Sequence, residues 1–367
     1  MVGSTAFKSK AIKAGDKLYP EWVGRFREFY RQFPEFFDAA YRETTCGSIP
    51  DSRPKLWKII GDEILFCCRV LSLEHLSCCV GAFITALEKY GATLGDIGLD
   101  VKGAGWVADF PAKNITLSIN DGSIAFNLAD EDLPTETFER RADSSPHGFD
   151  FLGSAIDIGF RVAGHAQADK FAASAELALL LAEAKDQQLF TREFRYDGRL
   201  TLKGVNGSHP YPVVFVDTER NHGKREIRIR EKLLTREQPI EALALRDFLR
   251  AYLTFHNFEL PALPMRTGDP SPAPPQSYEQ YKKQWGRDLE GARLQDEIIQ
   301  ASQTKAEPEK RTEETGRDVS LDRQKEAMRR SLAHRALSDA ALIQRHERLQ
   351  RFKGILRKPD DSKKDDE

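Results

Sequence analysis

The spacing of apolar residues predicts several helices within the first 258 residues. In the Tyr19–Tyr41 segment they recur every three or four positions, which indicates an amphipathic helix that Pro34 bends or divides. Leu71–Lys89 has the same helical period, and Gly153–Ala163 is also expected to be helical. Ser174–Ala184 consists mostly of Ala, Leu and Glu, which have high helix propensity.

Short runs of β-favouring residues lie between these helices. Leu56–Ile60 and Ile64–Val70 are joined by Gly61-Asp62-Glu63, which predicts a hairpin with a glycine-led turn. Further strands are expected at Leu99–Phe110, at Asn114–Leu128 as a strand pair, and at Lys170–Ala173. The alternation predicts an α/β fold, with helices packed on a mixed or antiparallel sheet.

Composition divides the chain into three regions. Residues 1–258 have a globular pattern, whereas 259–280 form a proline-rich linker with six prolines between Pro261 and Gln276. Residues 281–367 form a charged, partly helical tail with too little apolar content to fold alone. Within it, Ala340–Leu356 reads as a basic amphipathic helix that either stays solvated or contacts a partner, a membrane surface or nucleic acid.

Charge and cysteine content exclude several classes of protein. The 367 residues include 55 Lys and Arg against 57 Asp and Glu, a formal charge of −2, which gives no global attraction to nucleic acid or anionic lipid. No apolar run is long enough to span a membrane, and no secretory signal opens the sequence. The five cysteines, four of them in the adjacent pairs Cys67-Cys68 and Cys78-Cys79, suit buried apolar positions in a reducing compartment. A cytoplasmic protein is expected.

The first chemically informative segment is the predicted hairpin. With a strand period of two, Lys58 shares one face with Leu56 and Ile60, and Trp57 lies on the other. Asp62 follows the turn glycine and is expected at the rim of the sheet. Lys58 and Asp62 either serve a ligand, or Lys58 extends to solvent while Asp62 stabilises the turn.

The second informative segment is His147–Arg161. It places Asp150 just before the helix that opens near Gly153, with Asp157 and Arg161 on one face of that helix at a spacing of four. The simpler alternative for these last two side chains is a surface ion pair of small energy.

Together the two segments resemble the class III nucleotidyl cyclases, over about residues 1–185. The family's Lys-x-x-Gly-Asp hairpin matches Lys58 and Asp62, which implies a base-reading lysine and a metal-binding aspartate. The family's later motif matches Asp150 as a base-reading aspartate and Arg161 as a phosphate-binding arginine. Asp157 stands where the family has a ribose-positioning asparagine.

The amino-terminal Val2-Gly-Ser-Thr5 resembles the end of the family's Asp-Ile-Val-Gly-Ser-Thr sequence. The matching aspartate, a metal ligand in the family, would precede Met1, and the backbone carbonyl of Met1 would be a further ligand. We expect translation to start upstream; the alternative is that this ligand is missing.

The resemblance implies a head-to-tail homodimer with composite sites and two divalent ions, Mn²⁺ or Mg²⁺. The Lys55–Glu63 sequence and a strand at Tyr211–Asp217 are similar to the Pycsar pyrimidine cyclases of bacterial antiphage defence. This implies conversion of UTP to cyclic UMP and pyrophosphate, and a separate effector that senses the cyclic nucleotide. CTP as substrate, a purine (adenylate) cyclase and a degenerate, non-catalytic cyclase fold are the alternatives.

Overall fold

A computed structural model describes residues 1–5, 21–49, 52–94, 99–111, 114–120, 123–124, 135–205, 209–235, 238–275, 278–284 and 287. Contacts divide the chain into a first unit, Met1–Asp288, and a second, Leu289–Glu367. The predicted tail, including the helix expected at Ala340–Leu356, lies outside the described residues apart from 281–284 and 287.

The centre of the first unit is a seven-stranded sheet with the order β2-β3-β1-β4-β8-β12-β9. Its first half is built, in chain order, from β1 (Val2–Thr5), α2 (Glu21–Arg42), β2 (Lys55–Ile60), β3 (Glu63–Cys67), α3 (Leu73–Leu94) and β4 (Asp100–Gly105). All neighbours in this half are antiparallel. In this β-α-β-β-α-β order the two helices, α2 and α3, cover the sheet.

The second half of the sheet comes from β8 (Lys170–Ala173), β9 (Phe194–Arg195) and β12 (Val214–Asp217). β8 is parallel to β4, whereas β12 is antiparallel to both β8 and β9. The sheet is therefore mixed, and the predicted α/β class is confirmed. The segment predicted as one strand at Tyr211–Asp217 is divided: β11 (Tyr211–Pro212) pairs with β10 (Arg199–Leu200) in a separate two-stranded sheet.

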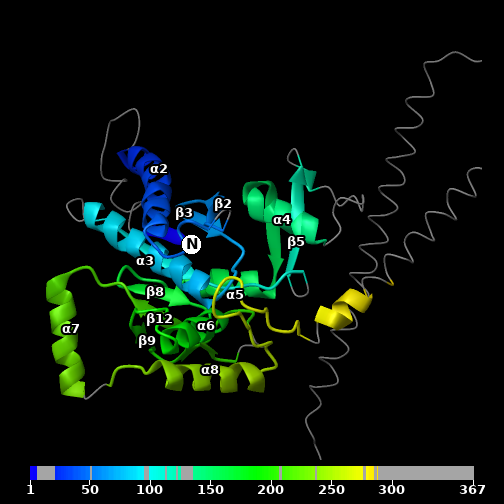
Figure 1. The fold of residues 1–367 in the computed structure, drawn as a ribbon. Coiled ribbons are helices and arrows are strands. Elements are labelled where there is room, and N and C mark those ends of the chain that lie inside the picture. Colours follow the sequence, from blue (N-terminus) through cyan, green and yellow to red (C-terminus); the bar gives the residue numbers. More distant parts are fainter. Residues whose placement is uncertain are drawn as a thin grey trace, which may run out of the picture. The chain divides into compact units, whose positions relative to one another are not determined.

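The core lies between the sheet and its helices. α2 is one continuous helix despite Pro34, and it buries Phe29 and Phe33 against Phe83 and Tyr90 of α3. On the other half, α6 (Ala175–Asp186) is buried almost throughout and packs against α8 (Ala242–Phe255), as Figure 1 shows. α6 confirms the predicted Ser174–Ala184 helix.

A three-stranded sheet with the order β6-β5-β7 stands beside the main one. It contains β5 (Asn114–Asn120), β6 (Ser123–Ile124) and β7 (Phe149–Gly153), followed directly by α5 (Ser154–Ala163). α4 (Glu136–Ser144) covers one face and buries Phe138 against Phe149. The predicted strand pair and α5 are confirmed as far as they are described. β7, which carries Asp150, and α4 were not expected from the sequence.

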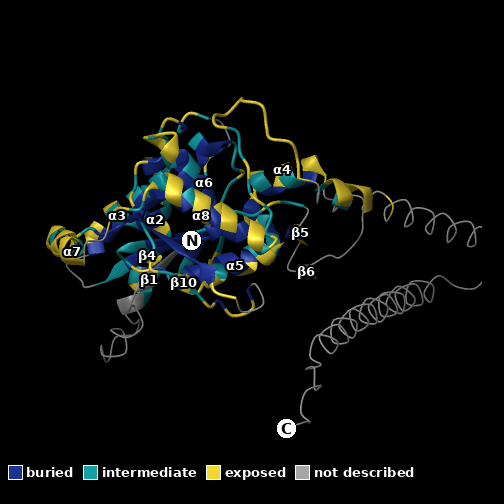
Figure 2. Ribbon diagram, turned by 90° about the horizontal axis from the view of Figure 1, so that it is seen from below, coloured by how far each residue is buried: buried dark blue, intermediate teal, exposed yellow. Residues whose placement is uncertain are grey.

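The proline-rich segment predicted as a linker lies within the first unit. The carbonyl of Pro264 accepts a hydrogen bond from Leu73 N at 2.9 Å, and that of Met265 accepts one from Glu74 N at 3.1 Å. These amides open α3, where a helix has no acceptors of its own. By contrast, α7 (His222–Thr235) has no buried residue among those described and is coloured as exposed in Figure 2.

Candidate active site

A β-bulge in β2 sets the direction of the candidate lysine. Leu56 lies opposite Phe66 of β3, but Lys58 lies opposite Leu65, so one extra residue is inserted between them. The period-two prediction that Lys58 shares a face with Leu56 is therefore wrong. The bulge puts Lys58 on the side of Trp57, and its ammonium lies 4.1 Å from the centre of the Trp57 ring.

Lys58 and Asp150 are brought together by this arrangement. Lys58 Nζ donates to Asp150 Oδ1 at 2.6 Å, and each side chain is 32% exposed. The residues that precede Lys58 and Asp150 are also in contact, because Trp57 Nε1 donates to the carbonyl of Phe149 at 3.1 Å. This hydrogen bond joins β2 to β7. A donor and an acceptor are thus held side by side, open to solvent on one side.

The face of β7 that carries Asp150 is apolar around it. Leu117 of β5 lies opposite Asp150, and Ile115 lies opposite Leu152 in the same antiparallel ladder. Directly paired residues point to one side of a sheet, so these side chains share a face. Ile115 and Leu152 are each 46% exposed, which is unusual for a cross-strand pair of large aliphatic side chains.

The hairpin tip is a two-residue turn, because Ile60 pairs with Glu63 and Gly61 has a φ of 60° that favours glycine. The hydroxyl of Tyr30 in α2 donates to the carbonyl of Gly61 and fixes the tip. Asp62 is half-buried there. Burial raises the pKa of Glu63, and the charge of Asp62 raises it further. The turn places Asp62 at the rim of the sheet, as predicted.

α5 presents the remaining two candidates. Gly153 precedes the helix at a φ of 147°, a conformation that side chains rarely adopt. Gly159 packs against Trp106, so closely that a Cβ at this position would lie 2.1 Å from the indole. Asp157 and Arg161 are both exposed, and in the described part of the chain no ion pair joins them.

The predicted metal ligands, Asp62 and the carbonyl of Met1, stay a prediction. Among the residues that the structure describes, no group of three or more His, Cys, Asp or Glu side chains could hold a metal ion. The carbonyl of Met1 accepts from Ala104 N at 2.9 Å within the sheet. By the register of β1, Met1 falls beside Leu65 of β3, whereas Asp62 lies in the turn before Glu63. These residues alone do not fit a two-ion centre.

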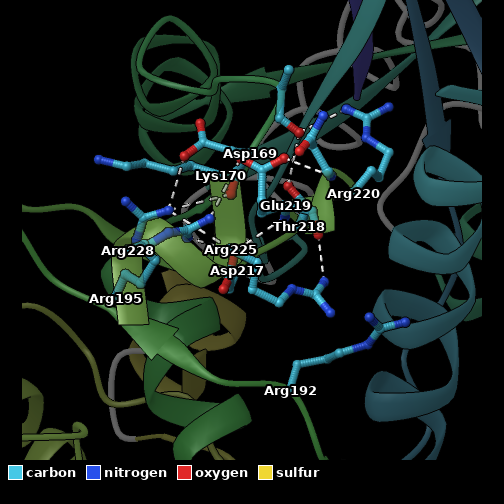
Figure 3. A network of polar contacts seen from close by, with 12 residues as sticks. Asp169, Lys170, Arg192, Arg195, Asp217, Thr218, Glu219, Arg220, Arg225 and Arg228 are labelled. Atoms are coloured by element: carbon cyan, nitrogen blue, oxygen red, sulfur yellow. Dashed lines mark hydrogen bonds and ion pairs between the residues drawn. The ribbon is translucent and has the colours of Figure 1, made fainter. Parts of the chain in front are cut away.

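A second polar cluster lies away from these residues, at the ends of β8 and β12 (Figure 3). Arg195 Nη1 lies 3.0 Å from Asp169 Oδ2, and Arg228 Nη1 lies 2.8 Å from Asp217 Oδ1. Although burial opposes it, the hydrogen bond and charge of Arg195 lower the pKa of Asp169. Arg228 comes from α7, so this cluster fastens that exposed helix to the sheet.

The chain also contains a cavity of about 540 Å³, lined by Met1 but by none of the other candidate site residues. Its walls combine apolar side chains with charged ones, including Arg69, Glu136 and Asp143, and these residues form no motif in the sequence. In the described residues no helix is both long and apolar enough to cross a membrane.

Comparison with known proteins matches no family model and no curated protein. Similar solved structures include the adenylyl cyclase CyaB from P. aeruginosa, with 12% identity, a TM-score of 0.38, and coverage of 59% of this chain and 90% of that one. The guanylate cyclase domain of RhGC from Catenaria anguillulae, in complex with GTP, has 11% identity, a TM-score of 0.33 and coverage of 59% and 92%. The guanylyl cyclase Cya2 has 11% identity, a TM-score of 0.32 and coverage of 59% and 88%. Likeness at this level assigns no activity, so the function is argued from the residues of this chain.

Proposed function

We propose that two copies of this chain form a nucleotidyl cyclase that converts a pyrimidine nucleoside triphosphate, UTP before CTP, to the 3′,5′-cyclic monophosphate and pyrophosphate. The observation that carries the proposal is the contact of Lys58 with Asp150. These two side chains come from the two motifs that resemble the class III cyclases, and nothing in their spacing along the sequence requires them to meet.

A neighbouring donor and acceptor can read the edge of a base. Uracil offers a carbonyl acceptor beside the N3–H donor, and cytosine offers the N3 acceptor beside an amino donor. In the free protein the ammonium of Lys58 and the carboxylate of Asp150 satisfy each other, and a base would replace that contact with one hydrogen bond to each. UTP is favoured by the similarity of the Lys55–Glu63 sequence to the pyrimidine cyclases.

The reaction itself is the attack of the ribose 3′-oxygen on the α-phosphorus. The O–P bond closes the ring, the bond to pyrophosphate breaks, and the hydroxyl proton is released. The exposed guanidinium of Arg161 suits the charge that develops on the α-phosphate oxygens. Asp157, one turn earlier on α5, would accept a hydrogen bond from a ribose hydroxyl.

The sites would be composite. Asp62 sits at the tip of the same hairpin whose strand carries Lys58, so one nucleotide cannot use both residues of one copy in these roles. Asp62 of the other copy would instead face the triphosphate, together with any divalent ion that it holds. Bound Mn²⁺ or Mg²⁺ would neutralise charge on the phosphates. The exposed Ile115–Leu152 pair, on the face that carries Asp150, supports an interface there.

The test is incubation of the purified chain with each of the four nucleoside triphosphates and Mn²⁺, with separation of the products by chromatography. Cyclic UMP as the main product would support the proposal. Cyclic CMP or a cyclic purine nucleotide would show that the substrate carries that other base. A separate protein that binds the cyclic nucleotide would then carry the signal of an antiphage response.

A non-catalytic cyclase fold is the second candidate. The observation in its favour is that the described residues of one chain form no metal-binding group. Binding of UTP without any cyclic product, measured with protein shown to be dimeric, would favour this alternative.

A further inference from the structure

Two free cysteines are in contact where the β2–β3 hairpin leads into α3. Cys68 directly follows β3, and Cys79 lies near the start of α3. Their Sγ atoms are 3.7 Å apart. The sulfurs of a disulfide lie about 2.05 Å apart, so these two would have to approach by only about 1.7 Å to form one.

The cysteines adjacent to this pair have different neighbours. Cys67 packs with Trp57 in a separate apolar cluster, as expected for successive residues that leave a strand on opposite faces. Cys78 Sγ lies 3.3 Å from Thr45 Oγ1, and its thiol also interacts with that of Cys46. Each member of the pair therefore has a neighbouring thiol in the sequence that can serve as its control.

The two paired thiols differ in their access to solvent. Cys68 is half-buried, whereas Cys79 is 7% exposed. The hydrogen bond with Cys68, together with burial, raises the pKa of the Cys79 thiol, so Cys79 stays protonated at neutral pH. An oxidant from solvent therefore meets Cys68 first, and Cys79 is placed to react with the product. An accessible thiol beside a resolving thiol is typical of cysteine pairs that oxidise reversibly.

We propose that Cys68 and Cys79 form a peroxide-sensitive thiol pair, which oxidation converts to a disulfide between the end of β3 and α3. With hydrogen peroxide, the Cys68 sulfur takes one oxygen as the O–O bond breaks, which leaves a sulfenic acid and releases water. The Cys79 sulfur then attacks the Cys68 sulfur, the S–O bond breaks, and the Cys79 proton leaves with the hydroxide as a second water. The two thiols lose two electrons, which the peroxide accepts. This inference goes beyond the proposed cyclase activity and does not depend on it.

The disulfide would fix the loop that joins the hairpin to α3. Ser72 caps α3 in this loop, because its Oγ accepts from His75 N at 3.0 Å. Arg69, also in the loop, pairs with Glu136 and Asp143 of α4 at 2.9 and 2.6 Å. A cross-link that closes a short loop restricts the unfolded chain, so the oxidised protein should be the more stable form.

The experiment treats the full chain with hydrogen peroxide, blocks the remaining thiols, and maps non-reduced tryptic peptides by mass spectrometry. In the parent, peptide 59–69 should be linked to peptide 70–89. The link should persist in the control variants Cys67→Ser and Cys78→Ser and be lost in Cys68→Ser and Cys79→Ser. Oxidation should raise the Tm of the parent by about 5 °C and slow amide exchange in residues 69–73 about fivefold, and dithiothreitol should reverse both effects.

Dimedone, which reacts with sulfenic acids, tests the order of the two steps. Its adduct should form on Cys68 in the Cys79→Ser variant, and an adduct on Cys79 in the Cys68→Ser variant would overturn that order. Absence of the linked peptide in the parent would overturn the proposal. So would a link that survives in Cys68→Ser, or one that joins the Cys46 peptide to peptide 70–89 in its place. No readout uses a nucleotide, so failure here leaves the cyclase assay untouched.

Discussion

Lys58 of β2 and Asp150 of β7 are 92 residues apart in sequence, and their Nζ and Oδ1 atoms lie 2.6 Å apart. Both side chains remain one-third exposed, so the pair contributes little to folding. Its position depends on the bulge before Lys58 and on the bond from Trp57 to Phe149. Bulges often re-aim side chains beside active sites. We propose that this weakly stabilising pair, which so much structure holds in place, serves the recognition of a ligand.

Replacement of Lys58 by Ala should separate recognition from stability. We expect kcat/KM for the preferred nucleotide to fall about 10- to 100-fold, because a charged hydrogen bond to the base is lost. The free energy of unfolding should change by less than about 1 kcal/mol. Lys55→Ala is the matched control, since Lys55 lies on the same strand and donates only to the carbonyl of Ser144 among the contacts described. Equal losses of activity in the two variants would contradict the assignment.

Mixing two inactive variants tests the composite site. Lys58→Ala and Asp62→Ala proteins, unfolded or dissociated together and reassembled, should recover about a quarter of the normal activity, because half the dimers are mixed and each has one intact site. Cross-linking or native mass spectrometry shows whether mixed dimers form. Mixed dimers without any recovered activity would mean that each site belongs to one chain.

Charge placed on the apolar face of β5 and β7 should prevent pairing of copies. Leu152→Glu introduces a carboxylate opposite Ile115, which an interface would have to desolvate. Sedimentation should show the variant as a monomer and the parent as a dimer. Ile229→Glu on α7, also exposed, is the control and should leave the dimer intact. A dimeric Leu152→Glu variant together with a monomeric Ile229→Glu variant would mean that the interface lies on α7.

Gly91→Ala should destabilise the fold although it appears conservative. A Cβ there would lie 1.4 Å from Nη1 of Arg220. The Arg220 side chain donates to the carbonyls of Leu87, Val101 and Ala168, and these bonds would be displaced. We expect a loss of about 2–4 kcal/mol in urea unfolding.

Gly24→Ala is the matched control for this substitution. Gly24 is also helical, and a Cβ at this position would have no neighbour within 4 Å. Alanine should therefore raise the free energy of unfolding by about 0.5–1 kcal/mol. If both variants have the same unfolding free energy, the Arg220 contacts are not the cause.

His75 should make the fold sensitive to mild acid. Leu71 N donates to its Nδ1 at 3.2 Å, so the proton is on Nε2, which lies 3.0 Å from the carbonyl of Ser52. Burial lowers the pKa of His75 below its usual 6.5. The folded state therefore binds fewer protons than the unfolded state, and stability falls as pH drops below 6.5. Urea unfolding at pH 7.5 and 5.5 should show this loss in the parent and a smaller one in His75→Asn.

Features of this fold that depend on neighbouring residues could be predicted from the sequence. Features that depend on how strands pair with one another could not. Gly61 marks the hairpin because the turn itself requires a positive φ. The bulge at Trp57 leaves no such mark, since it depends on how β2 pairs with β3. β7 was missed because five residues between a turn and a helix carry too little periodicity to identify a strand.

The candidate residues show the same division. The motifs placed Asp62 at a turn and Asp157 and Arg161 on a helix, and the structure agrees with each placement. The contact of Lys58 with Asp150 needs two sheets to meet, which no pattern within either segment encodes. The roles of all these residues in binding and catalysis stay predictions, as do the domain boundaries.

The acceptors that Pro264 and Met265 supply to α3 have a practical consequence for anyone trimming this protein. A version ending at residue 258, where the globular composition stops, would leave the first amides of that long central helix facing solvent. Fraying of the first turn of α3 would then weaken the helical layer that packs behind the β2–β3 hairpin. A minimal version should retain the segment up to about residue 270, because Pro264 and Met265 cap a helix that begins nearly two hundred residues earlier.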